Sequence, residues 1–165
     1  MYKFDSGQTS LMDFGMPLGL KLDPNNRWVK KAAIIPWGEI ESVYAALFTN
    51  QTGNVAKPLR LALGALIIQT EYQYSDAEVV LQIQENPYLQ YFCGFCEYTD
   101  KMPFDSSLMV HFRKRLTPEI LVEINEMVIA KATKSIKKVM IPNHQKMIIR
   151  TNRITIILRL PTKET

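Results

Sequence analysis

The sequence predicts an all-α fold, a compact bundle of about six helices with an irregular N-terminal arm and a poorly structured C-terminal tail. Three observations support this prediction. Apolar residues recur at helical spacing, residues that favour helix starts precede these segments, and no stretch before residue 138 alternates convincingly with the period of a strand. The expected organisation is an arm over residues 1–30, a helical domain over 31–134 and an aberrant basic tail over 135–165.

The arm is predicted to be irregular because glycines and prolines interrupt it, including the run Pro24-Asn25-Asn26. Six helical segments follow, each recognised by its apolar spacing or by a start residue such as proline, serine, asparagine or aspartate. They are Trp37–Thr49, Leu59–Tyr72, a segment after Ser75 ending near Glu85, Tyr88–Cys93, Leu108–Leu116, and a long helix after Thr117 reaching about Lys134.

Two of these segments carry specific structural expectations. The helix Leu59–Tyr72 is apolar nearly all round, so it should be the central and most buried helix. Ser75 and Glu78 have the spacing of a capping box, in which Ser75 accepts a backbone N–H and Glu78 reaches back.

Composition excludes several classes of protein. The chain has 165 residues, 47% of them hydrophobic, which suits one folded domain. No apolar run approaches the roughly 18 residues of a membrane span, and the N-terminus lacks the apolar stretch of a secretory signal. Two cysteines do not make a disulfide framework. We therefore expect a soluble cytoplasmic protein.

The net charge of +4 is unevenly distributed. Residues 135–165 contain seven Lys or Arg and one Glu, whereas residues 1–134 contain 13 basic and 15 acidic residues. Because the predicted helical domain is slightly acidic, a claim of nucleic-acid binding has to rest on a local basic patch. The tail would bind DNA by charge alone.

The segment Leu108–Leu116 supplies such a patch. Leu108, Phe112 and Leu116 can face the core at four-residue spacing. The outward positions are Ser107, His111, Lys114 and Arg115, with Arg113 beside them. A basic face of this kind, in a helix-turn-helix-like element, can dock on phosphates and read base edges, and the helix N-terminus would itself favour a phosphate. The alternative is a solvated basic face paired to acids such as Glu119 or Glu123.

Other chemistry is less well supported. The aromatic group Tyr88–Tyr98 has spacing more typical of a core than of base stacking. Cys93 and Cys96 form a lone C-x-x-C pair, which is half a zinc site, so no metal or cofactor is expected. The aspartates all fall in loops, the arm or cap positions, where no carboxylate group for magnesium is visible. We predict no catalytic residues.

Three ordered blocks, Lys57–Gln69, Tyr74–Phe95 and Pro103–Leu116, resemble the InsH-like N-terminal domain of bacterial insertion-sequence (DDE-type) transposases, over about residues 30–134. The resemblance implies a helical domain that binds the terminal inverted repeats of the element. In such transposases an RNase H-like domain follows, whose Asp, Asp and Glu bind two metal ions. None of those residues can be placed on this sequence, so we expect a truncated, catalytically inert fragment with DNA as its partner.

The predicted DNA-facing residues are Ser107, His111, Arg113, Lys114 and Arg115, with Lys57 and Arg60 as lesser candidates. The sequence leaves open whether the reading helix is Leu108–Leu116 or Ala77–Gln84.

Two alternative functions remain open. The fragment could inhibit an intact transposase through mixed complexes, or pair with itself, using the helices Leu59–Ile68 and Thr117–Lys134 as contact surfaces. It could also be a non-functional remnant in which a frameshift produced the Ile- and Thr-rich tail.

Overall fold

The computed structural model describes residues 1–4, 9–48 and 55–139, and within them the chain is all-helical, which confirms the predicted fold class. Most of the predicted tail, residues 140–165, lies outside the described part. The elements are a 3-10 turn at Pro17–Gly19 and the helices α1 (Arg27–Ile34), α2 (Trp37–Ala46), α3 (Leu59–Tyr72), α4 (Asp76–Glu85), α5 (Pro87–Phe92), α6 (Leu108–Arg115) and α7 (Pro118–Val139).

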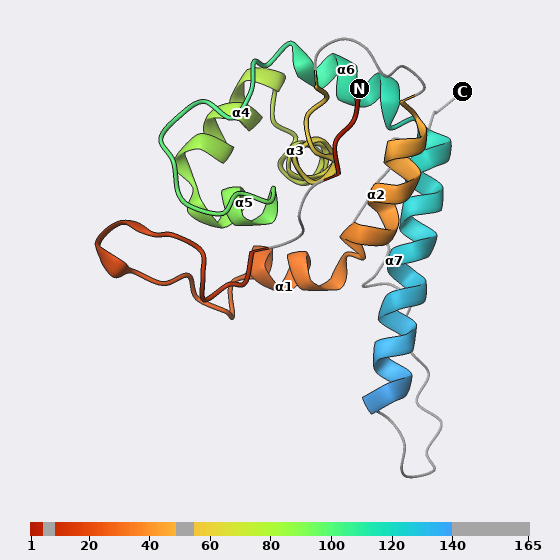
Figure 1. The fold of residues 1–165 in the computed structure, drawn as a ribbon, viewed down its shortest axis with the longest axis horizontal. Helices are drawn as coiled ribbons and strands as arrows, with labels where there is room; N and C mark the ends of the chain where they lie inside the picture. Colours follow the sequence, from red (N-terminus) through yellow and green to blue (C-terminus); the bar gives the residue numbers. More distant parts are fainter. Residues whose placement is uncertain (5–8, 49–54, 140–165) are drawn as a thin grey trace.

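Helix α3 lies at the centre of the molecule, and Figure 1 looks nearly along its axis with the other helices arranged around it. Every residue from Leu59 to Ile68 is buried, and α3 packs against α2, α4, α5 and α6. This confirms the predicted central helix. It also makes wrong the idea that Leu59–Ile68 offers a surface to a partner, because its neighbours within the fold already cover it.

Helix α1 was not predicted from the sequence, because Pro24-Asn25-Asn26 was interpreted only as a break. The side chain of Asn26 instead caps the helix, its Oδ1 accepting a hydrogen bond from the backbone N–H of Trp28 at 2.8 Å. Trp28 and Ala32 then enter the core, and Lys31 forms an ion pair with Glu71 at the end of α3. The last residues of the predicted arm are therefore helical.

Residues 9–26 of the arm are irregular apart from the 3-10 turn, and they extend away from the helices as the red and orange loop of Figure 1. Gly15 connects this loop to the segment after α5. Its N–H donates a hydrogen bond to the Cys96 carbonyl at 3.0 Å, and its carbonyl accepts one from the Tyr98 N–H at 2.8 Å. A Cβ on Gly15 would lie 2.8 Å from the Cβ of Glu97, so this close approach requires glycine.

Side-chain caps start α4 and α5, as they start α1. Ser75 Oγ accepts the Glu78 N–H at 3.1 Å, as predicted, but the Glu78 carboxylate accepts a bond from Gln82 where a return bond to Ser75 was expected. Asn86 Oδ1 accepts the Tyr88 N–H at 2.9 Å and starts α5. Helix α2 ends three residues before the predicted Thr49, and α7 continues to Val139, past the predicted end near Lys134.

Arg60 of α3 is a buried cation that joins three helices. Only 6% of it is exposed, and it donates hydrogen bonds to the carbonyls of Phe92 and Tyr91 at 2.9 and 2.8 Å, at the C-terminal end of α5. Its guanidinium also lies over the rings of Trp37 in α2 and Tyr91, 5.0 and 5.7 Å from their centres. A buried charge is tolerated only when it is compensated in this way.

We predict that Arg60→Met lowers the free energy of unfolding by about 2–4 kcal/mol, because two buried carbonyls at the end of α5 lose a charged donor. Urea unfolding followed by circular dichroism measures this. Lys30→Met, which changes an exposed cation of α1, is the matched control and should shift stability by no more than about 0.5 kcal/mol. Equal stability of the Arg60 variant and the wild type would show that the guanidinium is not a structural anchor.

Candidate nucleic-acid interface

Helix α6 has one buried side and one open side. Met109 and Phe112 are buried against α3, and Leu116 just after the helix is buried as well. Figure 1 shows α6 at the edge of the bundle, at the top of the view. The helix contains four basic or titratable side chains, at positions 111 and 113–115, and no acid.

Four residues form an exposed stripe along α6. Ser107, Val110, His111 and Lys114 are all exposed, and their spacing of three, four and seven residues places them on one side of the helix. Val110 was not singled out by the sequence analysis, although its position between Ser107 and Lys114 on the outward side could have indicated it. The stripe combines an apolar, a hydroxyl, an imidazole and an ammonium group on one surface.

A hollow of about 370 Å³ borders this stripe and gathers three of the predicted DNA-facing residues. Lys57, His111 and Arg115 line it, together with the apolar residues Met1, Phe48, Val55, Ala56, Leu108 and Phe112. The Arg115 guanidinium lies 4.9 Å from the centre of the Phe48 ring. Lys57 Nζ is 3.3 Å from the Pro103 carbonyl, and the residue is exposed. Residues far apart in the sequence thus place positive charge beside α6.

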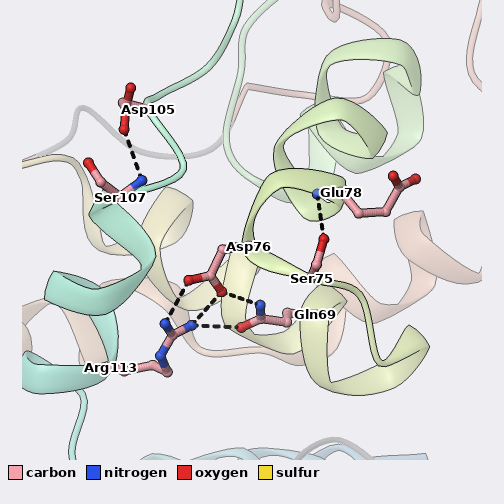
Figure 2. Close-up of polar contacts among 7 residues, drawn as sticks. All are labelled: Gln69, Ser75, Asp76, Glu78, Asp105, Ser107 and Arg113. Carbon is pink, nitrogen blue, oxygen red and sulfur yellow. Dashed lines mark hydrogen bonds and ion pairs between the residues drawn. The ribbon is translucent and has the colours of Figure 1, made fainter.

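Arg113 is not among the residues that line this hollow, and its side chain bonds to residues of α3 and α4 (Figure 2). Two of its nitrogens donate to the two carboxylate oxygens of Asp76, each at 2.7 Å, and one also reaches Gln69 Oε1 at 3.2 Å. Gln69 Nε2 donates to Asp76 at 2.7 Å, which closes the triangle. Hydrogen bonding from Arg113 lowers the pKa of Asp76 below its ordinary value, and Asp76 raises the pKa of Arg113.

A carboxylate lies just before the N-terminus of α6. Asp105 Oδ1 accepts the Ser107 N–H at 2.9 Å, and the hydrogen bonds from Ser107 lower the pKa of Asp105 (Figure 2). The Asp105 carboxylate therefore places a negative charge just before α6, which is unfavourable for a second anion at this helix end. Binding of a phosphate by the N-terminus of α6 stays a prediction, and the basic side chains of α6 are the stronger candidates for phosphate contacts.

Arg60 does not lie with the other candidates. It is buried on the far side of α3 from α6, against the end of α5, so its guanidinium is not at the surface that the other candidates share. The predicted alternative reading helix, Ala77–Gln84, falls within α4, whose sequence carries Asp76, Glu78 and Glu85 and no Lys or Arg. An acidic helix is poorly suited to approach a polyanion.

Other chemistry finds little support in the described residues. In those ranges no three His, Cys, Asp or Glu side chains are grouped as a metal site would require. Cys93 is buried, which raises the pKa of its thiol to about 12, while Cys96 is exposed. The aromatic group at positions 88–98 packs on the core, as predicted. No described helix has the length and apolar character needed to cross a membrane.

Comparison with known proteins places the chain in a family. Residues 17–115 match the model of the transposase domain (DUF772). A protein of Rhizobium meliloti, named uncharacterized protein ORF8 in nfe locus, is 35% identical over 103 residues, covering 62% of this chain and 49% of that protein. The chain thus spans about half the length of the relative it matches. No solved structure matches. Because this match covers α1 to α6, including the basic helix α6, the chain belongs to the transposase domain (DUF772) family.

Proposed function

We propose that this domain recognises DNA through the outward surface of α6. The observation that carries the proposal is the stripe Ser107, Val110, His111 and Lys114, which is exposed, free of acids and backed by a rigid buried side. A helix that presents such a surface at the edge of a bundle is suited to enter a major groove. Membership of a transposase family supports DNA as the partner.

The side chains divide into two roles. Lys114, Arg115 and Lys57 carry full positive charges at or near the hollow and are assigned to phosphates, which fix position without reading sequence. Ser107, His111 and Val110 are assigned to base edges, where a hydroxyl and an imidazole exchange hydrogen bonds and an apolar side chain meets a thymine methyl group. The proposal gives no catalytic role to the described helices.

Arg113 is assigned a positioning role. Its guanidinium is half exposed, but a phosphate contact would have to displace the paired hydrogen bonds to Asp76. Bidentate pairs of this kind are geometrically specific, and this one fixes the rotation of α6 relative to α4. The direction in which the stripe faces therefore depends on Arg113.

The terminal inverted repeats of the element that encodes this chain are the proposed target. The test is a salt titration of binding to a duplex of these ends and to a scrambled duplex of equal length. Tighter binding to the ends that survives moderate salt supports sequence recognition. Equal and strongly salt-sensitive binding to both duplexes would contradict it and leave only charge attraction.

Lys114→Ala should weaken binding to both duplexes and reduce the slope of log affinity against log salt by about 0.9, because one phosphate contact is lost. Lys30→Ala provides the matched control, since it removes an exposed lysine from α1, which packs on α5 and α7 instead of α6. Fluorescence anisotropy at several salt concentrations measures both. If the two variants behave alike, the assignment of Lys114 fails.

Asp76→Asn should lower the free energy of unfolding near neutral pH by about 0.5–1 kcal/mol, as expected for a partly exposed ion pair. The folded-state pKa of Asp76 lies below its unfolded value, so the pair stabilises the protein above about pH 4 and this contribution is lost as the pH falls through the folded pKa. The difference between variant and wild type should therefore shrink in acid. Urea unfolding at several pH values measures it.

The matched control is Glu78→Gln, which removes another carboxylate from the first turn of α4 without touching Arg113. DNA binding by the Asp76 variant distinguishes a positioning role of Arg113 from direct contact with a DNA phosphate. A positioning role predicts unchanged or weaker binding, whereas tighter binding would indicate that Asp76 had been competing with DNA for the guanidinium.

A further inference from the structure

Helix α7 packs on the bundle with only one of its sides. Ile124 and Val128 are buried, and Lys131 Nζ donates to the carbonyls of Ala33 and Ile35 at 3.3 and 3.1 Å, at the end of α1. Figure 1 shows α7 along the outside of α1 and α2, continuing past α1. As far as Lys134, where the described side chains of α7 end, the opposite side of this helix carries exposed residues.

That opposite side carries an apolar seam. Val122 is 47% exposed and Ile129 is 38% exposed, and their separation of seven residues places them two turns apart on one line of the helix. The sequence continues the same spacing to Ile136, still within α7. Apolar residues that recur every seven positions supply one of the two lines of contact by which paired helices pack along their length.

The charges of α7 are segregated along its axis. Glu119, Glu123 and Glu126 are exposed, and the sequence from 118 to 130 contains no Lys or Arg. From 131 to 139 the helix contains Lys131, Lys134, Lys137 and Lys138 and no acid. Lys131 is bonded to α1, while Lys134 is exposed. The sequence of α7 is thus acidic in its first half and basic toward its end, and among the described side chains Glu119, Glu123 and Glu126 are exposed in the first part and Lys134 in the second.

We propose that α7 pairs antiparallel with α7 of a second copy of this chain, with Ile129 near the twofold axis. In this register Val122 of one copy lies level with Ile136 of the other. Glu119 and Glu123 then lie within two positions of Lys137 and Lys134 of the other copy. A parallel pair would place carboxylates against carboxylates, so the charge pattern favours the antiparallel orientation and a partner with the same sequence.

Few apolar residues and exposed ion pairs make a weak interface, so the association should depend on protein concentration and on salt. The surface needs neither α6 nor DNA, and the inference is independent of the proposed DNA binding. Sedimentation velocity of the full chain over a wide range of concentration should show a dimer that dissociates as salt is raised. A monomer at every concentration would overturn the proposal.

Charge reversal tests the pairing. The double variant Glu119→Lys with Glu123→Lys, and the double variant Lys134→Glu with Lys137→Glu, should each raise the dissociation constant about tenfold or more. An equal mixture of the two variants should recover association as a mixed dimer. Glu119, Glu123 and Lys134 are exposed, and circular dichroism checks that both variants fold. Unchanged self-association of either variant, or no recovery on mixing, contradicts the proposal.

Cross-linking tests the orientation, in a Cys96→Ser background because Cys96 is exposed. Ile129→Cys should form a disulfide-linked dimer readily, since the two residues meet at the axis. Glu119→Cys should not, because antiparallel helices place the two positions about 30 Å apart along the axis. Efficient cross-linking at position 119 would indicate a parallel pair and overturn the proposal.

Discussion

The packing of α2, α3 and α5 depends on one constraint, which is that the buried positive charge of Arg60 needs partners within the fold. A cation so deep in the core would destabilise the fold without partners, and it finds them in the last carbonyls of α5 and in the rings of Trp37 and Tyr91. The chain then turns away at Gly94, whose φ of 92° is unfavourable for other residues and whose position leaves 2.9 Å between a hypothetical Cβ and the Arg60 side chain. The ends of α2, α3 and α5 are fixed together by this one side chain.

The burial of α3 on every side determines what the remaining helices can do. Because α3 is covered by α2, α4, α5 and α6, each of these helices contributes one side to the core and keeps another for solvent. In α4 the solvent side is acidic, and in α6 it is basic. The ion pair between Asp76 and Arg113 joins these two helices at the point where their charges meet. This pair occupies Arg113 of α6, while the stripe from Ser107 to Lys114 stays exposed.

The sequence predicted what depends on local patterns and missed what depends on distant partners. The span of α3, the Ser75 cap and the buried side of α6 follow from helical spacing and capping chemistry, which act within a few residues. Helix α1 was missed because Asn26 serves equally well in a turn or as a helix cap. Arg60 and Arg113 have the same side chain, yet one is a core anchor and the other an ion-pair partner. That difference depends on Phe92 and Asp76, which only the folded chain brings near.

The two proposals fit one geometry. A domain that reads DNA through α6 alone covers a short site, and one phosphate-binding helix gives modest affinity and limited discrimination. Pairing through α7 relates two α6 surfaces by a twofold axis, the symmetry that also relates the two ends of an element bounded by inverted repeats. A weak protein interface suits this arrangement, because binding of one copy to each end would raise the effective concentration of the other. A tight dimer would instead form before either end is found, so the modest apolar seam of Val122 and Ile129 suits a weak dimer that forms without DNA at high protein concentration and that DNA ends would favour further.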